Sequence, residues 1–173
     1  MSAPALDVAV RPLVAGDLSA LDRMERTLFG VSAWTRQMLA EELVGPGRTY
    51  VGAELPGGSL VGYAGIWFDG RDAQVMTVAT DPGYQGRGIA RRMLVTLLER
   101  ARALGAESVL LEVRVDNAPA IHLYETLGFT QLGRRRGYYQ PENVDAWTMQ
   151  LLLPREVRVV REVPEVRSEQ EAS

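Results

Sequence analysis

A glycine-rich segment is the first place in the sequence where residue types and spacing indicate chemistry. Residues 81–90 read Asp-Pro-Gly-Tyr-Gln-Gly-Arg-Gly-Ile-Ala. Small residues occupy alternate positions in its second half, at Gly86, Gly88 and Ala90. Such residues let a ligand approach the backbone, and the first turn of a following helix stabilises a phosphate through its free N–H groups and dipole. The segment is therefore a candidate phosphate site, and a plain turn that requires glycine is the alternative.

A carboxylate in an apolar segment is the second candidate for chemistry. Glu112 interrupts the run Val109-Leu110-Leu111 and is followed by Val113. A carboxylate that is removed from water accepts a proton more readily, which suits a general base. The alternative is a solvent-facing residue that pairs with Arg114 on the same face of a strand.

Residue types that are absent exclude several classes of site. The chain has no cysteine, no lysine and one histidine, His122. Disulfides, thiol nucleophiles, a His/Cys zinc cage, a Walker A loop and a pyridoxal Schiff base are thereby excluded, and we expect no metal. We interpret His122 as a surface residue. The net charge of −3 argues against nucleic-acid binding, and the arginine run at residues 134–136 is interpreted as a solvated strand face.

The hydrophobic pattern predicts an α+β fold. Apolar alternation and turn residues predict seven strands, at residues 8–13, 50–55, 60–68, 73–80, 109–115, 129–135 and 146–153. Helical spacing and capping residues predict four helices, at residues 17–28, 35–44, 89–104 and 117–127. This order predicts a mostly antiparallel mixed seven-stranded sheet with a central βαβ crossover and flanking helices.

Composition divides the 173 residues into one domain and two ends. We expect a flexible N-terminus at residues 1–6, a domain at residues 7–153, and a charged, mobile tail at residues 154–173. An added edge strand from residue 155 to 163 is the alternative for the tail. No stretch predicts a membrane helix or a signal peptide, so we expect a cytoplasmic protein without membrane contact. The oligomeric state cannot be inferred.

Two longer patterns carry a family resemblance. The start Gly86-x-Gly88 also fits a dinucleotide fingerprint, but the third small position of that fingerprint falls on Arg91. In contrast, Gln85-x-x-Gly88-x-Ala90, the helix Asn117-x-x-Ala120-x-x-x-Tyr124-x-x-x-Gly128-Phe129 and the order of elements resemble the GNAT N-acetyltransferase superfamily. Leu111-Glu112-Val113-Arg114 and Arg135-Arg136-Gly137-Tyr138-Tyr139 resemble its ribosomal-protein-alanine N-acetyltransferase branch. The resemblance covers about residues 7–153.

The resemblance implies an activity and a set of site residues. It implies transfer of acetyl from acetyl-CoA to the N-terminal amine of a ribosomal protein, with Glu112 as general base and Tyr124 as general acid. An aromatic core residue is the alternative for Tyr124. The implied acetyl-CoA contacts are Val78, Ala79, Thr80, Gln85, Gly86, Arg87, Gly88, Ile89, Ala90, Arg91, Asn117 and Tyr124. Residues 78–80 would act through their backbone if the sheet splays after this strand, and Asn117 would also cap its helix.

The sequence gives fewer indications of which residues bind the acceptor of the acetyl group. We expect Tyr138 and Tyr139 to lie in a loop between the last two strands, with at least one on the acceptor cleft. A basic protein target would be attracted by acidic residues, for which Glu41, Glu42 and Asp145 are candidates. An acetyltransferase of lysine side chains or of a small amine is the alternative function, and an acyl-CoA-binding module without turnover is a third.

Overall fold

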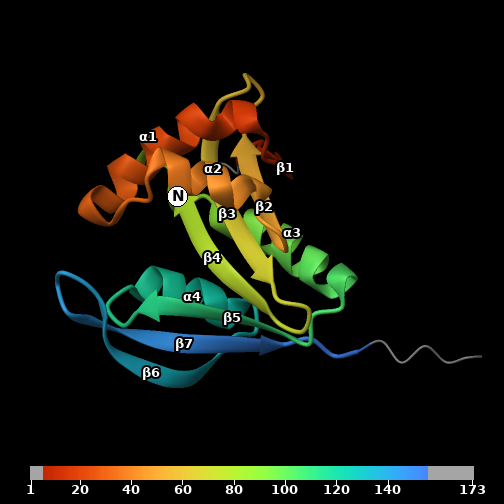
Figure 1. Cartoon of the computed structure of the whole chain (residues 1–173), viewed down its shortest axis with the longest axis vertical. Coiled ribbons are helices and arrows are strands. Elements are labelled where there is room, and N and C mark those ends of the chain that lie inside the picture. The colour runs from red at the N-terminus through yellow and green to blue at the C-terminus, as the bar shows by residue number, and fades with distance from the viewer. Residues whose placement is uncertain (1–5, 156–173) are drawn as a thin grey trace, which may run out of the picture.

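The computed structural model describes residues 6–155 and confirms the α+β class. A single seven-stranded sheet has the order β1-β2-β3-β4-β5-β7-β6 (Figure 1). The strands are β1 Ala9–Pro12, β2 Arg48–Glu54, β3 Leu60–Phe68, β4 Ala73–Thr80, β5 Ser108–Arg114, β6 Thr130–Tyr139 and β7 Val144–Leu152. The helices are α1 Leu18–Phe29, α2 Arg36–Val44, α3 Ile89–Leu104 and α4 Ala118–Thr126, with 3₁₀ turns at Ala15–Asp17, Gly30–Ser32 and Pro82–Tyr84.

The two central strands, β4 and β5, share fewer paired residues than any other neighbouring strands of the sheet. Every neighbouring pair is antiparallel except β4 and β5, which pair in parallel only at Ala73–Val109 and Gln74–Leu110. The register between β3 and β4 shifts so that Met76 has no partner, and such a bulge bends and twists the strand. Beyond Gln74 the two strands therefore diverge, as Figure 1 shows for the pair of arrows that meet at one end and spread apart at the other.

Apolar residues on the two faces of the sheet form two cores. On one face α3 buries the stripe Ile89, Met93, Leu94, Leu97 and Leu98, which its amphipathic spacing predicts. On the other face α1 packs against β3 and β4, and α2 packs against α1 and β2. Burial of each large apolar side chain contributes about 1.5–3 kcal/mol, so the helices hold β4 in place from both sides.

One predicted boundary is wrong. Tyr138 and Tyr139 are the last residues of β6 and do not lie in a loop, because Tyr139 pairs with Val144 at the start of β7. The strand is hard to see in the sequence because β6 lies at the edge of the sheet and most of its residues are exposed. A strand that is exposed on both faces shows no apolar alternation, because that alternation arises when one face is buried. The predicted termini fall largely on residues 1–5 and 156–173, which lie outside the described residues, so the domain limits stay predictions.

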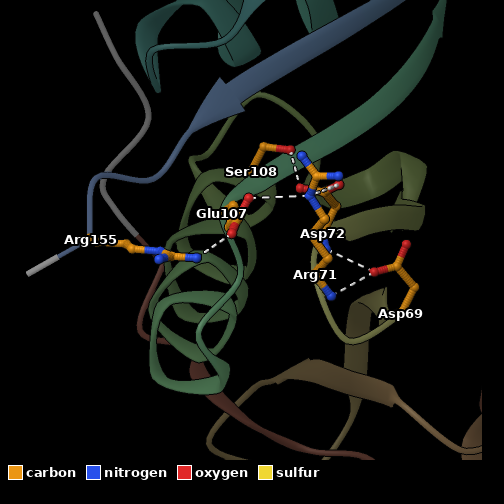
Figure 2. Close-up of polar contacts among 6 residues, drawn as sticks. All are labelled: Asp69, Arg71, Asp72, Glu107, Ser108 and Arg155. Carbon is orange, nitrogen blue, oxygen red and sulfur yellow. Dashed lines mark hydrogen bonds and ion pairs between the residues drawn. The ribbon is translucent and has the colours of Figure 1, made fainter.

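Polar contacts close the end at which β4 and β5 meet (Figure 2). Ser108 Oγ at the start of β5 donates to Asp72 Oδ1 at 2.8 Å, just before β4. The Glu107 N–H donates to the Arg71 carbonyl at 2.8 Å, and Arg71 Nε donates to the Glu107 carboxylate at 3.2 Å. Arg155, which follows β7, donates to the same carboxylate. We call Arg71, Asp72, Glu107 and Ser108 the clamp.

Removing Asp72 and removing Ser108 from the clamp should lower the free energy of unfolding by different amounts. Ser108 is 4% exposed, so Asp72→Ala leaves a buried hydroxyl without an acceptor and costs about 1–3 kcal/mol in the free energy of unfolding. Ser108→Ala leaves an aspartate that water can reach, so we expect a smaller loss, about 0.5–1.5 kcal/mol. Urea unfolding of both variants measures the difference, and a larger loss for Ser108→Ala contradicts this account.

Candidate active site

A cavity of about 820 Å³ opens where β4 and β5 diverge. Its walls bring together six of the residues that the sequence singles out. They are Val78 from β4, Glu112 from β5, Asn117 and Tyr124 from the α4 region, and Tyr138 and Tyr139 from β6. The remaining wall comes from α1 and the segment after it, which includes Phe29 and Trp34.

Glu112 is held at the cavity by two side-chain donors. Its side chain is 11% exposed. Thr148 Oγ1 donates to Oε2 at 2.7 Å, and Arg135 Nη1 donates to Oε1 at 3.3 Å. Arg114 binds Asp116 instead, so the alternative pairing of Glu112 with Arg114 is wrong. The two donors fix the carboxylate in one orientation on the cavity wall.

Tyr124 combines a packed ring with access to the cavity. The residue is buried, and its ring meets Phe129 edge-to-face at a centroid distance of 5.9 Å. Burial raises the pKa of its phenol to about 12. The hydroxyl therefore keeps its proton at neutral pH and can serve as a donor. The aromatic core role and a chemical role are compatible in one side chain.

The β4 edge that faces the cavity carries unused backbone groups. Met76, Thr77 and Val78 line the cavity, and within residues 6–155 no strand pairs with this edge beyond Gln74. The sheet therefore splays here, which is the condition under which residues 78–80 could act through their backbone. Asn117 Oδ1 accepts from the Ala120 N–H at 3.3 Å, so this residue caps α4 as predicted while it also lines the cavity.

The glycine-rich segment lies at the end of β4, beside the cavity rather than in its wall. Gly86 and Gly88 have φ values of 74° and 79°, which favour glycine, and a Cβ added at either would meet open space. Gln85 donates to the Thr80 carbonyl at 3.1 Å, which ties the segment to β4. The exposed first turn of α3 then presents its N–H groups, so the local structure fits a diphosphate.

The arginine of this segment and the one that follows it have further contacts. Arg87 lies over the Tyr84 ring at 5.9 Å, and Arg91 donates to Thr126 Oγ1 at 3.0 Å, which links α3 to α4. Ile89 is buried in the core and can act on a ligand only through its backbone. Ala79 is also buried, whereas Thr80 and Ala90 are half-buried.

Glu25 on α1 is a cavity residue that the sequence analysis missed. Its side chain is 3% exposed, its Oε1 accepts from the Trp34 N–H at 3.0 Å, and burial raises the pKa of its carboxyl. A signal was present, because Glu25 lies four residues after Leu21 and three before Leu28 on the apolar stripe of the helix. A charge on such a stripe indicates a buried polar group with a specific task.

The three acidic residues that the sequence suggested for acceptor contact lie outside the cavity wall. Glu41, Glu42 and Asp145 do not line the cavity. Glu42 accepts from the Tyr50 hydroxyl at 2.6 Å, and Asp145 binds Arg134 and the Gly137 N–H, which lower the pKa of its carboxyl. Glu42 and Asp145 therefore have partners within the fold.

The described residues form neither a metal-binding cluster nor a membrane-spanning helix. Across residues 6–155 no group of three or more His, Cys, Asp or Glu side chains is arranged to hold a metal ion. No described helix is long and apolar enough to span a membrane. In the run of residues 134–136, Arg134 pairs with Asp145 and Arg135 with Glu112, and His122 is exposed as predicted.

Comparison with known proteins identifies the family. The profile of the Acetyltransferase (GNAT) family matches residues 18–129. The chain belongs to the GNAT family. It is an N-acetyltransferase, and enzymes of this family use acetyl-CoA. The predicted family resemblance is thereby confirmed.

Individual relatives show which members of the family the chain is similar to. The chain is 43% identical over 154 residues to N-alpha-acetyltransferase RimI of Mycobacterium tuberculosis, which covers 86% of this chain and 95% of the relative. It is 34% identical over 142 residues to a Bacillus subtilis protein named putative [ribosomal protein bS18]-alanine N-acetyltransferase, with 82% and 93% covered. The crystal structure of the ribosomal-protein-S18-alanine N-acetyltransferase from Escherichia coli matches with a TM-score of 0.79 at 28% identity, over 87% of this chain and 98% of that one.

The two left-handed glycines that flank α3 provide a test of the coenzyme site. Gly88 precedes the helix and Gly105 ends it, with φ values of 79° and 85° and open space around both. Leucine at either position costs about 1–2 kcal/mol of backbone strain. We expect Gly88→Leu to weaken acetyl-CoA binding at least tenfold, because the side chain blocks the approach of the diphosphate. Gly105→Leu should lose similar stability and keep its affinity.

Calorimetric titration with acetyl-CoA and thermal unfolding of both variants measure the two effects. Equal acetyl-CoA affinity in the two variants would move the diphosphate away from this helix terminus.

Proposed function

We propose that the chain transfers acetyl from acetyl-CoA to the N-terminal α-amine of a protein, a ribosomal protein that begins with alanine. The observation that carries this proposal is the cavity in which Glu112 and Tyr124 face the unpaired edge of β4. The printed names of the relatives support the choice of acceptor.

The residues that hold acetyl-CoA follow the path from α3 to the cavity. The backbone of residues 86–91 binds the diphosphate, with positive charge from Arg87 and Arg91, and the free edge of residues 78–80 pairs with the amide groups of the pantetheine arm. Asn117 contacts this arm from the opposite wall, since it lines the cavity while it caps α4. Bound acetyl-CoA supplies an acetyl thioester that an amine can attack.

Two side chains move the protons of the transfer. Glu112 removes a proton from the acceptor ammonium, directly or through one water, so that the neutral nitrogen forms the new C–N bond. Tyr124 donates its phenolic proton to the sulfur as the C–S bond breaks, which its raised pKa permits at neutral pH. The second proton, which the nitrogen loses as the amide forms, returns through water to the Tyr124 phenolate, so that thiol, amide and phenol are all neutral at the end. A backbone N–H on the free edge near Val78 polarises the acetyl carbonyl as negative charge develops on its oxygen.

The chemistry of the acceptor favours an α-amine over a lysine side chain. An α-amine has a pKa of about 8 and a lysine about 10.4, so at pH 7 roughly a tenth of the first and under a thousandth of the second is neutral. One carboxylate suffices for the easier proton. Tyr138 and Tyr139, which meet edge-to-face at 5.0 Å on the cavity wall, contact the first residues of the acceptor. A ribosomal acceptor places the reaction in the cytoplasm.

The role of Glu112 gives a pH-dependent prediction. Glu112→Gln should lower kcat/KM by about 10²–10⁴-fold, most strongly below the amine pKa of about 8, where help with deprotonation matters most. Tyr124→Phe should lower kcat, with less effect on acetyl-CoA affinity. A pH–rate profile of each variant is the measurement. Glu142→Gln, which removes one charge from the exposed rim of the same cavity, is the matched control. A Glu112→Gln profile that coincides with the wild type excludes the base role.

A competition between two peptides tests the acceptor. Both have the same arginine-rich sequence, but one has a free N-terminal alanine and no lysine, and the other has a blocked N-terminus and one internal lysine. We expect the free-alanine peptide to be acetylated at least tenfold faster, as mass spectrometry of the mixture can measure. Equal rates would favour the alternative of a lysine or small-amine acceptor.

A further inference from the structure

The buried carboxylate of Glu25 has one oxygen without a partner. Oε1 accepts from the Trp34 N–H at 3.0 Å, whereas Oε2 is buried and has no hydrogen-bond partner among residues 6–155. The side chain is 3% exposed and belongs to the wall of the cavity. A buried carboxylate oxygen without a donor is unfavourable by about 1–3 kcal/mol or more, so its retention in a cavity wall points to a ligand that supplies the donor.

The position of Glu25 limits the chemistry of that donor. Glu25 comes from α1, and Glu112 comes from β5 on the other side of the divergence between β4 and β5 (Figure 1). The charged residues that line the cavity are Glu25, Glu112, Glu142 and Arg114, so its wall is acidic overall. Arg114 is engaged by Asp116 and Glu142. A ligand that bears positive charge and several N–H donors suits this wall better than a neutral or anionic one.

From this we propose that Glu25 is an acceptor-binding residue whose Oε2 receives an N–H of the acceptor's α-ammonium group. The proposal rests on the proposed function and deepens it, because it assigns recognition of the amine to α1 and removal of its proton to β5. One N–H of the ammonium binds Glu25, and another faces Glu112. The nitrogen is thereby held between the two walls before transfer. The bond of Oε1 to the Trp34 N–H keeps the carboxylate oriented for this contact.

A pair of peptides that differ only in the amine separates recognition from a structural role. One peptide begins with alanine, and its analogue begins with a propanoyl group, which has the same carbon skeleton without nitrogen. Binding of each is measured by calorimetry in the presence of saturating CoA, so that no transfer occurs. Because a hydrogen bond to a charged group contributes about 1.5–3 kcal/mol, the wild type should prefer the amine peptide by about 10- to 100-fold.

Three substitutions then assign the preference to a residue. Glu25→Gln keeps an oxygen for the Trp34 N–H and removes the charge, so most of the preference for the amine peptide should be lost. Glu25→Asp keeps the charge on a shorter side chain and should recover part of the preference. Glu142→Gln removes one charge from the exposed rim of the same cavity and should keep the wild-type preference, since its residue is solvated and paired with Arg114.

The binding measurements distinguish failure of the proposal for Glu25 from failure of the proposed function. A preference that persists in Glu25→Gln overturns the proposal for Glu25 and leaves the proposed function intact. If Glu25→Gln loses affinity for both peptides and for acetyl-CoA with a lowered melting temperature, Glu25 serves only the α1–α2 connection and the proposal is also overturned. If the wild type binds neither peptide, the proposed function fails, and the role of Glu25 fails with it.

Discussion

Two residue pairs of parallel strand, Ala73 with Val109 and Gln74 with Leu110, join the two halves of the sheet. Everything on one side belongs to β1–β4 with α1, α2 and α3, and everything on the other to β5–β7 with α4. The bulge at Met76 prevents a longer ladder, and the clamp keeps the short one closed. The short junction leaves an open edge of β4 immediately beyond it.

The divergence of β4 and β5 produces both walls of the candidate site, the free backbone edge of β4 and the side chain of Glu112 on β5. On β4 it leaves backbone donors and acceptors unpaired toward the cavity, which would be unfavourable in a dry core and is suitable for an amide-bearing ligand. On β5 it exposes the side chain of Glu112 to a space that a continued ladder would fill. Because strands alternate their faces, Leu111 and Val113 enter the core while Glu112 faces the cavity.

The fold and much of the candidate site could be predicted because their signals are local. The stripe of α3, the capping residue Asn117 and the small residues of the glycine-rich segment follow from spacing alone. The family resemblance added the roles of Glu112 and Tyr124, which stay proposals. The partners Arg135 and Thr148 of Glu112 could not be predicted, because 23 and 36 residues of chain separate them from it. Glu25 was missed because its apolar stripe was assigned to the core without its one charged member.

Because the two halves of the sheet are joined at one end, a small rotation at the junction becomes a larger displacement farther along the strands. Four residues of strand separate Gln74 from Val78, a distance of about 13 Å at roughly 3.3 Å per residue. A rotation of about 5° at the junction therefore shifts Val78 by about 1 Å relative to β5, and a displacement of that size is enough to lower a transfer rate 100-fold. The clamp lies at the joined end of the sheet, outside the cavity wall, and its stiffness thus sets the tolerance with which the two walls face each other.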